Sequence, residues 1–294
     1  MLELDQVSRS FDRRKVLKEI SFTVDPGRLT GFVGSNGAGK TTAMRIVLGV
    51  LAADSGRVQW QGTPVDRAAR RRFGYMPEER GLYPKMRIKD QLVYFGRLYG
   101  LSAARAGQQA DRLLHRLNLT ERAGDRLDAL SLGNQQRVQV AVALVHDPVL
   151  LILDEPFSGL DPVAVDTMTA LLRDRAATGV PVLFSSHQLD LVERICDDLV
   201  IIADGGVVAA GPVTQLRAER AGARYRLVLA DDAGWLRDVP NLQVLDIEGP
   251  RALLELSDPA DDQQLLNRAL ERGPVHEFSR VIPALADIYR EVTR

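Results

Sequence analysis

A glycine-rich loop between an apolar run and a helical pattern is the feature that most constrains this chain. The apolar run from Leu29 to Val33 leads into GSNGAGKTT, and apolar residues at helical spacing follow from Ala43. Strand, glycine loop and helix in this order are typical of a nucleotide-binding α/β unit. Backbone N–H groups and the positive end of the helix converge on phosphate in such a loop. The predicted phosphate-binding residues are Gly34, Ser35, Asn36, Gly37, Ala38, Gly39, Lys40, Thr41 and Thr42.

Within this loop, Lys40 is predicted to reach the β- and γ-phosphates, and the Thr41 hydroxyl to meet Mg²⁺. Two adjacent carboxylates, Asp154 and Glu155, end a second apolar run that is typical of a strand buried on both faces of a parallel sheet. Neighbouring side chains of an extended chain point to opposite sides. Asp154 is therefore predicted to hold Mg²⁺, directly or through water, and Glu155 to deprotonate an attacking water. A helix cap or solvated turn is the alternative for this pair.

A third motif lies 23 residues before Asp154, in the segment from Leu130 to Arg137. Ser131 and Gly133 open a predicted helix, so a hydroxyl and free N–H groups meet whatever sits at its positive end. A simple N-cap is the alternative interpretation, and the position of the segment before Asp154 favours a functional one.

Composition excludes several other classes. The 294 residues carry 38 Lys and Arg against 39 Asp and Glu, so the chain lacks the positive field that binding to nucleic acid or an anionic membrane normally needs. One cysteine, Cys196, and an N-terminus without a signal-peptide core indicate a reducing cytosol. No stretch approaches the ~18 apolar residues of a membrane span.

The order of patterns predicts an α/β fold with a second, smaller domain. Alternating residues near the N-terminus predict two antiparallel strands, and residues about 87–147 form a helical insert on a parallel-sheet core. We expect a nucleotide-binding domain over residues 1–212. Residues 213–294 contain three predicted strands and two helices, and form an α+β accessory domain.

The three motifs, together with Ser158-Gly159-Leu160-Asp161 and His187 after two serines, resemble an ATP-binding cassette (ABC) ATPase over about residues 1–212. The tail is similar to the accessory domain of ATP-binding subunits of bacterial exporters of the drug-resistance and sodium-efflux types. The segment GYMPEERGLYPKM at residues 74–86 is also similar to that branch.

The resemblance implies roles for individual residues. Phe11 falls where the family stacks an aromatic ring on adenine, and His187 where it contacts the γ-phosphate. Asp161 falls where a residue reaches across the dimer. Glu78 stands where most cassettes have a glutamine that touches metal and water. Leu132 and Asn134 also depart from the family pattern LSGGQ, while the γ-phosphate donors Ser131 and Gly133 remain; Asn134 is counted with them as a nucleotide-binding residue.

The resemblance further implies that two copies bind head to tail around two ATP, each covering the other's phosphates. A permease in the membrane is the expected partner, docked in a groove between Glu78 and Met86 and the helices that follow. Leu82, Tyr83, Pro84 and Met86 are expected to be exposed there and to receive a short helix of the permease. The chain would then be cytoplasmic, held on the inner face of the membrane through the permease and driving export. No nucleic acid partner is expected.

Other classes of protein fit less well. Cytosolic ABC ATPases of translation usually carry two cassettes, and those of DNA repair are split by coiled coils, whereas this chain has one cassette and no heptad insertion between Gly34 and Glu155. A GTPase would need Asn-Lys-x-Asp to bind guanine, and the sequence lacks it. A scaffold protein would not need Glu155 beside Asp154.

Overall fold

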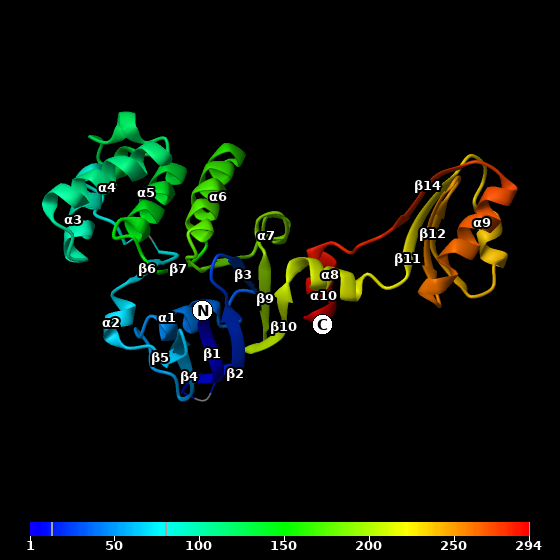
Figure 1. Ribbon diagram of the computed structural model, residues 1–294, viewed down its shortest axis with the longest axis horizontal. Helices are drawn as coiled ribbons and strands as arrows, with labels where there is room; N and C mark the ends of the chain where they lie inside the picture. Colours follow the sequence, from blue (N-terminus) through cyan, green and yellow to red (C-terminus); the bar gives the residue numbers. More distant parts are fainter. Residues whose placement is uncertain (13, 80, 294) are drawn as a thin grey trace. The chain divides into compact units, whose positions relative to one another are not determined.

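The computed structural model describes residues 1–12, 14–79 and 81–293 (Figure 1). Within these ranges the chain forms two compact units, residues 1–213 and 214–292. Residue 13 in the connection between the first two strands, residue 80 in the segment 74–86 and residue 294 at the end of the tail lie outside the described residues.

A six-stranded sheet forms the centre of the first unit. Its strands in spatial order are β10 (Gly206–Pro212), β9 (Asp198–Ala203), β3 (Leu29–Val33), β8 (Val182–Ser186), β7 (Leu150–Leu153) and β6 (Phe73–Met76). All neighbours are parallel except β10 and β9. Strands β3, β7 and β8 are buried at every position, which explains their mostly apolar sequences.

A second sheet of the first unit is antiparallel. Its order is β2 (Arg14–Val24), β1 (Leu2–Phe11), β4 (Ser55–Trp60) and β5 (Thr63–Pro64). Leu2 pairs with Val24 and Leu4 with Phe22, so the alternating apolar residues of both strands point into one core shared with Phe32 of β3. The predicted antiparallel pair is confirmed, whereas β4, β5 and β6 were not predicted.

Helices of the first unit complete the predicted insert and flank the parallel strands. They are α1 (Lys40–Val47), α2 (Arg67–Arg70), α3 (Ile88–Leu98), α4 (Ala103–Arg116), the 3-10 turns η1 (Thr120–Arg122) and η2 (Leu127–Ala129), α5 (Leu132–Leu144), α6 (Pro162–Ala177) and α7 (Leu189–Ile195). Figure 1 shows α3, α4 and α5 grouped together, and they contact one another. Helix α1 ends at Val47, one turn earlier than its apolar pattern predicts.

The second unit is a four-stranded antiparallel sheet with helices. The strand order is β12 (Leu242–Glu248), β13 (Arg251–Leu256), β11 (Arg224–Leu229) and β14 (Val275–Arg280). The other elements of the unit are the 3-10 turns η3 (Gly234–Asp238) and η4 (Pro259–Asp261) and the helices α9 (Asp262–Arg272) and α10 (Leu285–Val292). Helix α8 (Val213–Arg220) begins at the boundary between the units. The hydrophobic core of the second unit includes Leu227, Leu254 and Leu265. The predicted α+β class is confirmed; strand β14 and helix α8 were not predicted.

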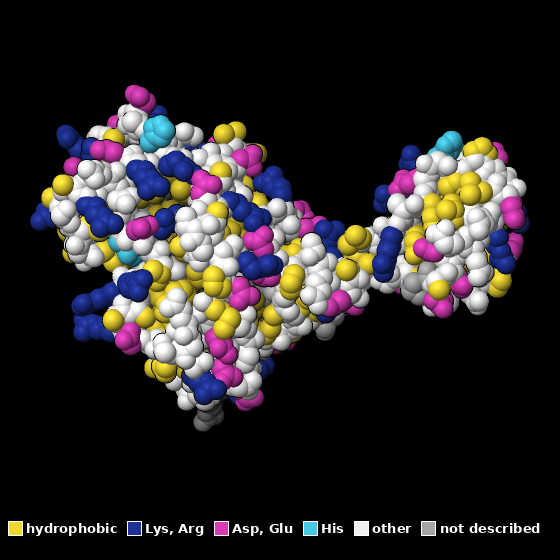
Figure 2. Space-filling model, viewed as in Figure 1, with side chains coloured by type: hydrophobic (Ala, Val, Ile, Leu, Met, Phe, Trp, Pro, Cys, Tyr) yellow, Lys and Arg dark blue, Asp and Glu magenta, His cyan; other side chains and the backbone are white. Residues whose placement is uncertain are grey.

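The surface carries charges of both signs. Figure 2 shows Lys and Arg side chains interspersed with Asp and Glu side chains over the face in view, as the balanced composition predicts. Among the described helices, none has both the length and the apolar character that crossing a bilayer requires.

Candidate functional site

The glycine loop connects the end of β3 to the first turn of α1. A Cβ on Gly34 would lie 2.4 Å from the carbonyl oxygen of Ile202, so only glycine fits there without movement of the backbone. Gly39 adopts φ 112°, a left-handed conformation that favours glycine, directly before the helix begins at Lys40. The loop therefore turns sharply enough to expose Ser35, Asn36 and Gly37 in front of the helix N-terminus.

Lys40 is the buried cation of this loop. Its ammonium donates to the carbonyl oxygens of Gly34 at 2.6 Å and Ser35 at 3.2 Å, and the residue is only 8% exposed. Burial lowers the pKa of Lys40, while the negative charges of Glu155, Asp154 and Glu78 act in the opposite direction. A desolvated ammonium beside open backbone N–H groups is suited to attract a phosphate group.

Asp154 joins the loop to the parallel sheet. Its Oδ2 accepts from the Thr41 hydroxyl at 2.9 Å, and its Oδ1 accepts from the Ser185 hydroxyl at 2.5 Å. Asp154 is 1% exposed. A carboxylate beside a hydroxyl oxygen supplies the hard oxygen ligands that Mg²⁺ prefers. No group of three or more His, Cys, Asp or Glu residues suited to a metal occurs in the described part of the chain.

Glu155 is held at its backbone and at its side chain. Its N–H donates to Ser185 Oγ at 2.8 Å, and its carbonyl accepts from Gln136 Nε2 at 2.9 Å. Its carboxylate Oε2 lies 3.0 Å from His187 Nδ1. The backbone of Glu155 has φ 52°, so it leaves the extended path of β7. The carboxylate contacts His187 and is close enough to Lys40 for its negative charge to act on the pKa of that residue.

The structure brings together one group of predicted residues and leaves another apart. Residues 34–42, Asp154, Glu155 and His187 form one site at the carboxyl ends of β3, β7 and β8. Ser131 caps α5 by accepting from the Asn134 N–H at 3.4 Å, and Asp161 caps α6 by accepting from the Ala164 N–H at 2.7 Å. The hydrogen bonds of both residues therefore go to their own helices.

Four of the other predicted residues, Phe11, Glu78, Tyr83 and Pro84, are exposed. Phe11 is 44% exposed, and the Arg9 guanidinium lies 5.0 Å from its ring centroid. Glu78 is exposed but close enough to influence the pKa of Lys40. Tyr83 and Pro84 are exposed as expected, whereas Leu82 and Met86 are half-buried, so the exposure predicted for these two residues is wrong. The Met86 carbonyl accepts from the buried Gln91, which fixes this part of the segment.

Sequence reasoning missed three residues that hold the site. Ser185 contacts both Asp154 and Glu155, Gln136 contacts Glu155, and Gln139 Nε2 donates to the Pro77 and Glu79 carbonyls at 2.6 and 3.2 Å. The only sequence signal for Ser185 is its place in a strand two residues before His187. Gln136 lies inside the predicted motif from Leu130 to Arg137 but was assigned no role there, and Gln139 lies just beyond it on α5. No local pattern distinguishes either glutamine from a surface residue.

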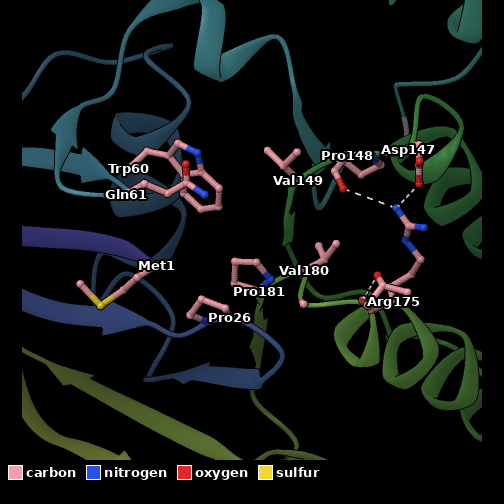
Figure 3. Close-up of a pocket in the computed structure, with 12 residues that line it drawn as sticks. Met1, Pro26, Trp60, Gln61, Asp147, Pro148, Val149, Arg175, Val180 and Pro181 are labelled. Carbon is pink, nitrogen blue, oxygen red and sulfur yellow. Dashed lines mark hydrogen bonds and ion pairs between the residues drawn. The ribbon is translucent and has the colours of Figure 1, made fainter.

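A cavity of about 490 Å³ lies elsewhere in the first unit (Figure 3). It is lined by Met1, Pro26, Trp60 and the residues that precede β7 and β8, including Val149 and Pro181. These residues mark the amino ends of the parallel strands, whereas ligands of such sheets bind at the carboxyl ends. The Arg175 guanidinium in its lining already donates to Asp147 and to the Pro148 carbonyl. The cavity is thus separate from the site around Lys40.

Almost the whole chain is similar to the uncharacterized ABC transporter ATP-binding protein YhaQ of Bacillus subtilis (strain 168). The identity is 35% over 291 residues, which cover 99% of this chain and 98% of that protein. The chain belongs to the ABC transporter ATP-binding proteins. The Nod factor export ATP-binding protein I of Paraburkholderia xenovorans (strain LB400) is 36% identical to this ABC protein over 99% of this chain and 96% of that protein.

Both parts of this ABC protein also match family models. The model for the ABC transporter family matches residues 17–158, and that for the C-terminal domain of DrrA1-3-like ATP-binding proteins matches residues 211–293. A solved ATP-binding subunit of an ABC transporter is 32% identical, with a TM-score of 0.69 over 74% of this chain and 92% of that one. The predicted family, its ABC ATPase fold and its role as a transporter ATP-binding subunit are confirmed; a translation or repair ATPase is not favoured.

Proposed function

We propose that this ABC protein binds ATP with Mg²⁺ in the site around Lys40 and hydrolyses it to ADP and phosphate. The observation that carries the proposal is the continuous set of contacts from Thr41 through Asp154 and Ser185 to Glu155 and His187. In this arrangement the loop N–H groups and Lys40 bind the phosphates. Thr41 and Asp154 would hold Mg²⁺, with Glu78 at its edge, and the ion would neutralise negative charge on the phosphates.

Glu155 is the base of the proposed reaction. Its carboxylate takes a proton from the attacking water as the bond from the water oxygen to the γ-phosphorus forms and the bond from that phosphorus to the oxygen of the leaving ADP breaks. His187 lies 3.0 Å from Glu155 Oε2 and keeps that carboxylate in place, while its exposed ring is free to meet the γ-phosphate. Phe11, exposed at the end of β1, would stack on adenine.

Two copies are proposed to close head to tail around two ATP molecules. Ser131, Gly133 and Asn134 lie at the amino end of α5, where the unpaired N–H groups of a helix favour an anion. Leu132 between them is 59% exposed, so this end of the helix faces solvent in the single chain. Asp161 lies at the exposed start of α6 and would meet the second copy in the same closure.

A membrane permease is the proposed partner, and export the proposed direction. Tyr83 is 50% exposed and lies 5.9 Å from Tyr94 and 6.2 Å from Phe95, centroid to centroid. Beside this aromatic cluster, α3 lines a groove of about 510 Å³ with the apolar and aromatic residues Val93, Tyr94 and Leu98 and the charged residues Asp90 and Arg97. A groove with both apolar and charged residues suits a short amphipathic helix. Docking there would place the chain on the cytoplasmic face of the membrane. The name of the similar Nod factor export protein supports the direction.

Two measurements test this function. Phosphate release by the purified protein should require ATP and Mg²⁺ and should vanish in Glu155→Gln, and a wild-type protein without ATPase activity, alone or with its permease, would refute the hydrolysis. For the permease, Tyr83→Glu should prevent co-purification with the membrane protein encoded beside it. Leu270→Glu is the matched control, because Leu270 is 54% exposed but lies on α9 of the second unit. A permease that co-purifies equally with both variants would refute the docking surface.

A further inference from the structure

The backbone of Glu155 is in a conformation that needs external support. With φ 52° it lies in the left-handed region, which is unfavourable for residues with a Cβ. Its N–H and its carbonyl are both withdrawn from the strand ladder and are satisfied by side chains, Ser185 Oγ on β8 and Gln136 Nε2 on α5. The Ser158 N–H, at 3.2 Å, also donates to the carbonyl. The direction of the Glu155 carboxylate therefore depends on these neighbours.

Gln136 contacts Glu155 from helix α5, whereas Ser185 contacts it from the neighbouring strand β8. It is 4% exposed and its amide reaches Glu155 across 19 residues of sequence. One turn further along α5, Gln139 is 3% exposed and donates to the carbonyls on either side of Glu78. Two buried glutamines on one helix thus hold the two segments that carry Glu155 and Glu78.

We propose that Gln136 is a positioning residue that fixes the backbone of Glu155 to helix α5. The inference rests on the proposed function, in which Glu155 is the base. Because α5 is a rigid helix that begins beside Ser131, Gln136 lies only about 7 Å along the axis from the end that would cover the second copy's ATP. A displacement of α5 by that ATP is transmitted through the Gln136 amide to the Glu155 carbonyl. Hydrolysis in one site then responds to the nucleotide in the other.

Gln136→Met tests the proposal because methionine fills a similar volume but cannot donate a hydrogen bond. Misplacing a catalytic group by about 1 Å can cost about 100-fold in rate, so we expect kcat to fall by about 10- to 100-fold. The Kd for ATP, measured by calorimetry in the Glu155→Gln background, should change by less than about threefold, because Gln136 touches no predicted nucleotide-binding residue. A merely structural role would not separate kcat from Kd in this way.

Gln91→Met is the matched control. Gln91 is equally buried at 0% exposure and also bonds to backbone carbonyls, those of Tyr83 and Met86, but it does not contact Glu155. Its kcat should stay within about twofold of wild type, while its unfolding midpoint falls as that of Gln136→Met does. If Gln136→Met does not fold, Gln136→Asn takes its place, since it keeps the amide but is one methylene too short to reach the carbonyl.

The results distinguish this proposal from the proposed function. A wild-type protein that hydrolyses ATP together with a Gln136 variant whose kcat lies within about twofold of it would overturn the positioning role alone. The role would also be wrong if ATP affinity fell as much as kcat, or if Gln91→Met lost as much activity. A wild-type protein without ATPase activity would instead overturn the function on which the proposal rests.

Discussion

Replacing Lys40 by methionine isolates the contribution of one buried charge to nucleotide binding. The ammonium is 8% exposed, so its attraction to phosphate acts at an effective dielectric constant of about 20 and is worth about 4 kcal/mol at 4 Å. The ammonium must loosen its bonds to the Gly34 and Ser35 carbonyls to reach the phosphate, at a cost of about 1 kcal/mol. About 3 kcal/mol remains, which corresponds to an increase of about 100-fold in the Kd for ATP.

Titration calorimetry with Mg²⁺ and ATP at one fixed salt concentration measures this change. Lys18→Met is the matched control, because Lys18 is exposed and its loss alters the formal net charge equally, from -1 to -2 in each variant. Its Kd should stay close to that of the wild type, since exposed charges are screened. If Lys40→Met binds ATP within about threefold of the Lys18→Met control, the phosphates do not sit at this loop and the reasoning fails.

Two other predictions concern catalysis and stability. Glu155→Gln should elute as a dimer in size-exclusion chromatography with saturating ATP, because ATP still binds but the attacking water is no longer deprotonated. Elution as a monomer at saturating ATP would contradict the proposed head-to-tail dimer. Burial lowers the pKa of His146 to about 4. Its Nε2 lies 3.2 Å from the Phe73 carbonyl, and its buried Nδ1 has no hydrogen-bond partner among the described residues. In the unfolded chain His146 takes up a proton near pH 6.5, whereas in the folded chain it does so only near pH 4. The free energy of unfolding should therefore fall as the pH drops from 6.5 towards 4, by at most about 3 kcal/mol. Urea unfolding of His146→Gln should show a weaker decline over that range, and equal pH slopes in both proteins would show that His146 is not the group responsible.

The parallel strands with the strongest sequence patterns were predicted within one or two residues. Strand β7 is a continuous apolar run and β3 is interrupted only by Thr30 and Gly31, so burial on both faces is visible in the sequence itself. Strand β6 is as short as β7 but was missed because Gly74 interrupts its apolar residues and its burial comes from pairing with β7. Strand β14 was missed for a related reason, since its residues are mostly half-buried and its sequence VHEFSR lacks a clean alternation.

The candidate site shows the same division between local and tertiary information. The glycine loop and the carboxylate pair are local patterns whose spacing carries their chemistry. Ser185 and Gln136 act on Glu155 across 30 and 19 residues, respectively, and each is an ordinary polar residue of a strand or helix in sequence. Their importance arises only because β8 lies beside β7 and α5 packs behind the end of β7, which no short pattern encodes.

Helix α5 unites these observations because its two parts have different surroundings. At its amino end, Ser131 and Leu132 are exposed to solvent. Further along the helix, Gln136, Gln139 and most of the apolar residues are buried. A hydrogen bond in the buried part is strong and geometrically fixed, whereas the N–H groups at the exposed amino end remain available to an anion. In the proposed closure, ATP of a second copy would meet the exposed amino end, and a rigid helix would pass the resulting displacement to its buried part. Gln136 in that part is bonded to the Glu155 carbonyl, so the proposed base would respond to a nucleotide that it does not touch.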